Sequence, residues 1–128
     1  MRDAAEELTR AEVLLECHDE TVSASAALSA AGFDRDDEVL VRHLVFVAAD
    51  RREQVLARCG MDGYLEAPAL PSDPTAPDDR IGVAVARLQR VDARTLSQER
   101  AIIGSMTARL SGESGGWAVL AAPDSGSA

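Results

Sequence analysis

Two long apolar segments constrain the fold of this chain more than any other feature. Residues 39–48 read VLVRHLVFVA, and residues 80–91 read RIGVAVARLQRV. Both are rich in β-branched and small apolar residues, and in the second segment Ile81, Val83 and Val85 recur with the two-residue period of a strand. Strands that are apolar on both faces are covered on both faces. We therefore predict that these segments are the central strands of one sheet.

Each long strand is followed by the signals of a helix. Asp50 and Glu53 have the three-residue spacing of a capping box, with aspartate in the role of serine or threonine. Thr95 and Gln98 form a second capping box. Apolar residues at helical spacing predict the inner face of each helix, namely Val55, Leu56 and Cys59 in the first and Leu96, Ile103, Met106 and Leu110 in the second.

Two shorter strands complete the predicted sheet, at residues 64–67 and 117–122. Segment 68–79 holds four of the five prolines and is predicted to be an exposed loop, because proline cannot donate to a strand ladder. The resulting order is the split βαβ of ferredoxin-like α+β folds, with a four-stranded antiparallel sheet and two helices on one face. We assign this domain to residues 39–122 and a flexible tail to residues 123–128.

An acidic helical segment is predicted at residues 1–38. Helix is expected over residues 3–31, in one piece or in two with Asp19 as the second cap, and Gly32 is the expected end. The apolar residues at near-helical spacing are Leu8, Ala11, Leu15, Val22 and Ala26. Residues 12–17, which read EVLLEC, also fit a strand, and we take this as the second choice.

The formal net charge of −9 is concentrated at the beginning of the chain. Residues 1–38 carry eleven acids and three arginines, whereas residues 39–128 carry eleven acids and ten arginines. A surface of this kind repels phosphate, so direct binding of nucleic acid is not expected. It attracts a basic protein partner. An acidic balance also keeps small proteins in solution, and this simpler explanation stays open.

The length of 128 residues is that of one domain, and no apolar stretch is long enough to cross a membrane. The first residues, MRDAAEEL, lack the apolar core of a secretory signal. Two cysteines do not make a disulfide framework, and reduced thiols fit a reducing compartment. These features predict a cytoplasmic protein without a membrane partner.

Candidate residues for chemistry are few. Cys17, His18, His43 and Cys59 do not have the spacing of metal ligands, so neither a metal nor a cofactor is expected. Cys59 lies on the apolar face of a predicted helix, where a thiol is inert, and His43 lies in the middle of a strand. The protein is therefore predicted not to be an enzyme. A small enzyme with its centre at Cys59 or His43 is the third-ranked hypothesis.

The only tryptophan follows a glycine-rich stretch, SGESGGWAVL, at residues 111–120. The glycines predict a tight turn just before the last strand. Trp117 then has two interpretations. It either contributes a large apolar surface to a core that is poor in aromatic residues, which we favour, or it lies half-exposed at the edge of the sheet and contacts a partner.

Four landmarks in order resemble a known family over roughly residues 20–122. They are VRHLVFV with His43, MDGYLEA with its Gly-Tyr pair, PDDRIGVAVARL, and ESGGW with its Gly-Trp pair. In this order and spacing they resemble regulator of ribonuclease activity B, the family of protein inhibitors of ribonuclease E. Arg42 stands where the family usually has an acid, and Ser114 and Gly115 replace its tyrosine and aspartate.

The resemblance implies inhibition of a ribonuclease E-type enzyme of RNA decay by protein–protein contact. The partner would be a basic nuclease or its scaffold, contacted by an acidic surface. The residues expected to take part are Glu12, Glu16, Glu20, His43, Asp78, Asp79, Glu113 and Trp117. The alternative is a ferredoxin-like domain that senses a ligand or forms a homodimer through the open face of its sheet.

Overall fold

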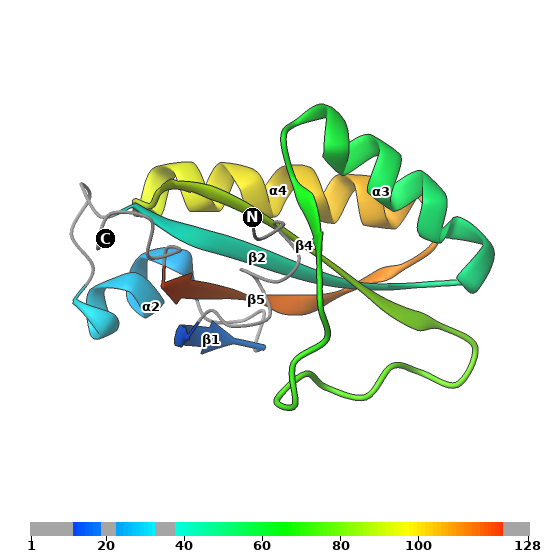
Figure 1. Cartoon of the computed structure of the whole chain (residues 1–128), viewed down its shortest axis with the longest axis horizontal. Helices are drawn as coiled ribbons and strands as arrows, with labels where there is room; N and C mark the ends of the chain where they lie inside the picture. The colour runs from blue at the N-terminus through cyan, green and yellow to red at the C-terminus, as the bar shows by residue number, and fades with distance from the viewer. Residues whose placement is uncertain (1–11, 19–22, 33–37, 122–128) are drawn as a thin grey trace, which may run out of the picture.

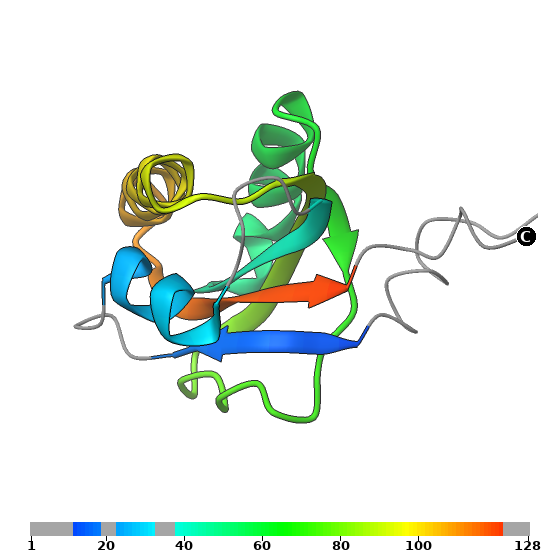
Figure 2. The ribbon, with the colours of Figure 1, turned by 90° about the vertical axis from the view of Figure 1, so that its left-hand side faces the viewer.

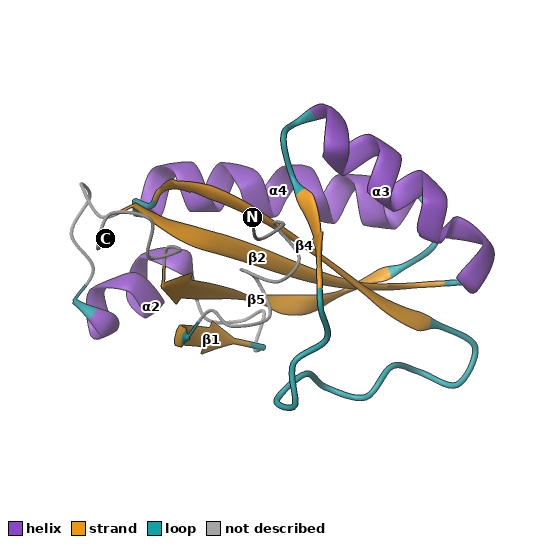
Figure 3. Ribbon diagram, in the orientation of Figure 1, coloured by secondary structure: helices purple, strands orange, loops and turns teal. Residues whose placement is uncertain are grey.

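A computed structural model of the chain describes residues 12–18, 23–32 and 38–121. Within these ranges the chain forms an α+β fold of five strands and three α-helices (Figure 1 and Figure 3). In chain order the elements are β1 (Val13–Cys17), α2 (Ala24–Ala31), β2 (Glu38–Val47), a 3-10 turn (Ala49–Arg51), α3 (Arg52–Met61), β3 (Leu65–Ala67), β4 (Ile81–Arg90), α4 (Ala93–Arg109) and β5 (Glu113–Ala121). The predicted fold class is thus confirmed at the level of α+β.

The five strands form one antiparallel sheet in the order β1-β5-β2-β4-β3. The two long strands lie side by side, with register running from Glu38 opposite Arg90 to Val47 opposite Ile81. This confirms the prediction that segments 39–48 and 80–91 are neighbours inside the sheet. The prediction of four strands is wrong by one, because β1 adds a fifth strand to the edge of β5.

Residues 13–17 form this extra strand rather than the predicted helix. In β1, Cys17 lies opposite Trp117, and Val13 lies opposite Leu120. Without β1, the long strand β5 would expose a row of unpaired backbone groups, and pairing with β1 removes this edge. The helix of this region begins later, where the Ser23 hydroxyl caps it by accepting a hydrogen bond from the Ala26 amide, and it ends as predicted at Gly32.

Helices α3 and α4 cover the same face of the sheet (Figure 2). In β2 the odd-numbered residues point toward them, and Val45 and Val47 pack with Val55 of α3 and Ile103 of α4. Helix α2 packs beside α4 over β1 and β5, in a cluster that contains Leu28, Leu96 and Trp117. The indole of Trp117 is 2% exposed. The interpretation of Trp117 as a core residue is therefore confirmed.

The opposite face of the sheet is lined by the even-numbered residues of β2 and by residues of β4. Loop 68–80, predicted as exposed, crosses this face (Figure 2) and packs Ala76 onto the cluster of Leu44, Phe46 and Ala84. The open sheet face that a homodimer would need is therefore partly occupied by the chain itself.

Strand β5 begins at Glu113, four residues earlier than predicted, so Gly115 and Gly116 lie within the strand, whereas Gly112 lies in the connection between α4 and β5. Leu44 of β2 is opposite Gly116 and Val45 is opposite Ser114, which leaves Gly115 as the extra residue of a β-bulge. A Cβ atom on Gly115 would lie 2.8 Å from the Phe46 ring. The glycine therefore lets the side chains of β2 close over the bulge.

The helix starts also differ from the predicted capping boxes. Helix α4 is capped by Asp92, whose carboxylate accepts a hydrogen bond from the Thr95 amide over 2.9 Å. A 3-10 turn precedes α3, which has no side-chain hydrogen bond at its cap. Aspartate before an apolar periodic segment is a strong cap, so Asp92 competes successfully with Thr95 for this position.

Candidate functional site

His43 lies at the centre of a buried polar cluster beneath α4. As an odd-numbered residue of β2 it faces the helices, and its side chain is 0% exposed. The Tyr64 ring meets it edge-on, with 5.6 Å between ring centroids and an interplanar angle of 77°. The cluster, called the polar cluster below, comprises His43, Tyr64, Arg87, Gln89, Glu99, Arg100 and Ser114. His43 is thus out of reach of a partner that docks on the surface.

Glu99 of α4 holds this cluster together. Its Oε1 atom accepts a hydrogen bond from the Tyr64 hydroxyl over 2.9 Å and lies 3.3 Å from His43 Nε2. Its Oε2 atom accepts a hydrogen bond from the Gln89 amide and lies 3.3 Å from Arg87 Nη2. Burial opposes ionisation of Glu99, but the hydrogen bonds outweigh it and lower the pKa of the carboxyl. Glu99 is therefore a buried carboxylate with its acceptor positions occupied.

The hydrogen bonds fix the protonation state of His43. Arg100 Nη1 lies 3.1 Å from His43 Nδ1, and because a guanidinium can only donate, Nδ1 must accept. The proton then resides on Nε2, which donates to Glu99. Burial lowers the pKa of His43, and the charge of Arg100 acts in the same direction. The imidazole is therefore neutral, with both nitrogens engaged.

The remaining members of the cluster are also satisfied within the fold. Arg87 lies over the Tyr64 ring, 4.4 Å from its centroid, and donates to the Asp62 carbonyl over 2.6 Å. Arg100 donates to the Ser114 hydroxyl over 2.6 Å. Burial raises the pKa of Tyr64, and the neighbouring Glu99 charge raises it further. The cluster therefore fixes α4 onto β2, β4 and β5, and its internal bonds occupy the groups that acid–base chemistry would use.

The thiol considered as a reaction centre is also buried. Cys59 is 3% exposed on the inner face of α3, with its sulfur 3.9 Å from the sulfur of Met106. Burial raises the pKa of Cys59, which disfavours the nucleophilic thiolate. Within the described residues, no group of three or more histidine, cysteine, aspartate or glutamate side chains is arranged to hold a metal ion.

The acidic residues expected to bind a partner fall into two groups, and Glu20 lies outside the described residues. In the first group, Glu16 of β1 accepts a hydrogen bond from the Ser72 hydroxyl over 2.7 Å and lies 3.0 Å from His18 Nε2. Glu12 precedes the same strand and is exposed, and its backbone carbonyl accepts a hydrogen bond from the Ala121 amide. Glu16 therefore ties β1 to loop 68–80, whereas the backbone of Glu12 pairs with the end of β5.

The second group lies where loop 68–80 enters β4. The Arg80 guanidinium lies 4.0 Å from the Asp79 carboxylate and 3.7 Å from the Glu113 carboxylate. Asp78 is exposed beside them. The structure thus brings Asp79 and Glu113 to a single arginine at one end of the sheet, and Asp78 precedes Asp79 in the loop. We call this group the acidic end.

A buried ion pair that the sequence analysis did not single out anchors loop 68–80. Arg42 is 2% exposed, and its Nη1 and Nη2 atoms donate to the two oxygens of Asp73 over 2.8 and 2.7 Å. Nη2 also donates to the Pro68 carbonyl, and Asp73 accepts from the Leu70 amide. The signal in the sequence was an arginine inside an apolar strand, because a buried charge requires a partner.

The only two histidines of the chain are expected to titrate on opposite sides of the ordinary value of 6.5. His18 donates from Nδ1 to the Gly115 carbonyl and from Nε2 to Glu16. Burial opposes its protonation, but these hydrogen bonds outweigh burial and raise the pKa of His18. Its contribution to stability is complete below 6.5 and is lost as the pH rises through the higher folded pKa. The pKa of His43 is lowered, so the contribution of neutral His43 to stability is present above pH 6.5 and is lost as the pH falls through the lower folded pKa.

Proton NMR titration of the two imidazoles measures this difference, and His18→Gln assigns the signals. We also expect the loss of unfolding free energy in His18→Gln, of about 0.5–1 kcal/mol for a partly exposed ion pair, to shrink between about pH 6 and about pH 8.5. Two imidazoles that titrate together near the ordinary value would contradict the assigned hydrogen bonds.

Comparison with known proteins adds no relative. No protein-family model matches the chain, and neither a curated protein nor a solved structure is similar to it. Across residues 12–18, 23–32 and 38–121, no helix is both long enough and apolar enough to cross a membrane. The functional interpretation therefore depends on the geometry of this chain.

Proposed function

We propose that this chain is a non-catalytic regulatory protein that binds a basic partner through its acidic end. The partner class that the sequence resemblance implies is a ribonuclease E-type enzyme of RNA decay or its scaffold. We further propose that the domain is ferredoxin-like, since β2, α3, β3, β4, α4 and β5 follow in the order of the split βαβ and β1 is an added edge strand.

The observation that carries this proposal is the exposure of the acidic end. The side chains of Asp79 and Glu113 are 88% and 54% exposed, and they lie on either side of Arg80. Two carboxylates beside one guanidinium, together with the exposed Asp78 next to them in the sequence, leave an excess of negative charge at this end of the sheet. Such a charge excess speeds encounter with an arginine-rich segment and weakens as salt is added.

The proposal assigns His43 and Trp117 to the fold rather than to the contact. Both were among the residues expected to bind the partner, and both are buried. The two residues would then link this chain to the resembled family through a shared core. The acids at the sheet end would carry the contact.

The experiment is a pull-down of the full chain with a ribonuclease E-type protein at rising salt. We expect retention at low salt, release with rising salt, and at least about a tenfold loss of affinity in the double variant Asp78→Arg, Asp79→Arg. The double variant Glu53→Arg, Glu66→Arg is the control with the same change of charge, because these two side chains lie on α3 and β3 and are 87% and 50% exposed. Absence of binding at low salt would overturn the nuclease as partner.

Ligand sensing is a second candidate function because of a cavity beneath loop 68–80. The cavity has a volume of about 320 Å³, and it is lined by Leu44, Phe46, Pro74 and Ala76 together with the Arg42–Asp73 pair. Arg42 Nε has no hydrogen-bond partner within the described residues. A small molecule with an apolar body and one hydrogen-bond acceptor for Arg42 Nε would raise the unfolding midpoint of the wild type but not of Ala76→Trp, which fills the cavity.

A further inference from the structure

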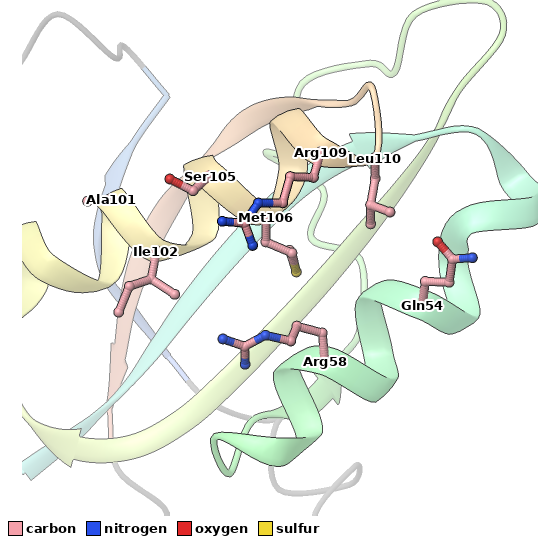
Figure 4. Close-up of a pocket in the computed structure, with 8 residues that line it drawn as sticks. All are labelled: Gln54, Arg58, Ala101, Ile102, Ser105, Met106, Arg109 and Leu110. Atoms are coloured by element: carbon pink, nitrogen blue, oxygen red, sulfur yellow. The ribbon is translucent and has the colours of Figure 1, made fainter.

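A groove runs between α3 and α4 on the side of the helices that faces away from the sheet (Figure 4). Its volume is about 560 Å³. It is lined by Gln54 and Arg58 of α3, and by Ala101, Ile102, Ser105, Met106, Arg109 and the adjoining Leu110 from the α4 side. This groove is separate from the polar cluster and from the acidic end.

The groove exposes one large apolar side chain, Ile102, that the core does not bury. Met106 forms its floor and is buried, whereas Ile102 is 51% exposed on the wall. Helix α4 already buries Leu96 and Ile103 against the sheet. Ala101 and Ser105 are small, so a third helix could approach α4 closely along this line. The exposed apolar wall therefore has the features of a surface that another element covers.

The charge of the groove is opposite to that of the chain as a whole. Arg58 and Arg109 extend into the space between the helices (Figure 4), and none of the lining residues is acidic. Arg58 forms an ion pair with Asp62 over 2.7 Å, but within the described residues no carboxylate pairs with Arg109. The surrounding segment 81–112 carries five arginines and two acids.

Neither of those two acids offsets the charge of the groove. Glu99 is buried in the polar cluster, and Asp92 caps α4 at the end far from Arg109. Arg109 itself lies in the last turn of α4. An occupant that suits the groove would therefore supply a carboxylate for Arg109, a second carboxylate that competes with Asp62 for Arg58, and apolar side chains for Ile102 and Met106.

We propose that this groove docks an acidic amphipathic helix of a partner protein. Its apolar residues, spaced three and four positions apart, would pack on Ile102, Met106 and Leu110, and its flanking carboxylates would pair with Arg58 and Arg109. A second copy of the chain does not fit this description, because within the described residues α2 is uncharged and α3 carries two arginines and only one acid. The inference is independent of the acidic end.

Selection from a displayed library of random 14-residue peptides against the full chain tests the proposal. We expect the enriched peptides to share acidic residues that flank leucine, isoleucine or methionine at helical spacing. In fluorescence polarisation the best peptide should lose at least about tenfold in affinity in each of the single variants Arg58→Glu, Arg109→Glu and Ile102→Glu. Arg90→Glu is the control, since it makes the same charge change at an exposed position of β4 outside the groove.

Three results would overturn the proposal. Enrichment of no peptide, or of peptides without acids, would show that the groove does not select this chemistry. Equal binding to wild type and to the groove variants, with unchanged unfolding midpoints, would place the peptide elsewhere. Displacement of the peptide by single-stranded RNA at equal concentration would show that the arginines bind phosphate in general.

Discussion

Replacing Glu99 by alanine is expected to cost about 3–5 kcal/mol of the free energy of unfolding. The Glu99 carboxylate is 7% exposed and is the shared acceptor for Tyr64, His43, Gln89 and Arg87. Its removal leaves the Tyr64 hydroxyl and the His43 N–H without their acceptor inside the fold, and an unpaired buried donor bears its full desolvation cost.

Urea unfolding of the two proteins measures the loss, and Glu53→Ala is the control. Glu53 is also a helical glutamate beside an arginine, but its side chain is 87% exposed, so we expect a change of about 0.5 kcal/mol or less. A loss below about 1 kcal/mol in Glu99→Ala would contradict the cluster as a source of stability.

Glu99→Gln separates the charge of this residue from its shape. The pKa of Glu99 is lowered, so its contribution is present above the ordinary value of 4.5 and is lost as the pH falls through the lower folded pKa. Glutamine does not titrate. The difference in unfolding free energy between wild type and Glu99→Gln should therefore shrink in acid, and a difference that is constant with pH would argue that Glu99 is not ionised.

The polar cluster also shows how far sequence reasoning reaches. The two long strands and the two helices that follow them could be predicted from local periodicity. The hydrogen bond between His43 and Glu99 could not, because it depends on the register of β2 and on the position of α4, and the two residues are 56 positions apart. One signal was present, since Glu99 continues the apolar stripe of Leu96, Ile103 and Met106. A single acid on such a stripe indicates a buried partner.

The edge of the sheet was less predictable for a related reason. Residues 13–17 have apolar spacing that fits both helix and strand, and a segment of five residues is too short for periodicity to decide. Residues 13–17 form a strand rather than a helix because they pair with the edge of β5. The same pairing explains Gly116, because its function depends on the backbone at the end of β1, which local sequence does not reveal.

Replacing Gly116 by alanine is therefore expected to separate β1 from β5. Gly116 has φ of +112°, a conformation that side chains disfavour, and an added Cβ would lie 2.6 Å from the Cys17 carbonyl oxygen and 2.9 Å from the His18 Cα. Since backbone atoms cannot rotate away, we expect a loss of roughly 2–4 kcal/mol from conformational strain and overpacking. Faster hydrogen exchange of the β1 amides should accompany this loss.

Gly104→Ala makes the same chemical change where there is room for it. Gly104 lies inside α4, and its added Cβ would meet nothing within 4 Å. Because glycine lowers helix stability relative to alanine, we expect Gly104→Ala to gain about 0.5–1 kcal/mol. Urea unfolding should thus shift in opposite directions for the two variants. If Gly116→Ala unfolds at the wild-type midpoint with its β1 amides still protected, then β1 does not pack against Gly116, and the edge strand of the sheet is incorrectly placed.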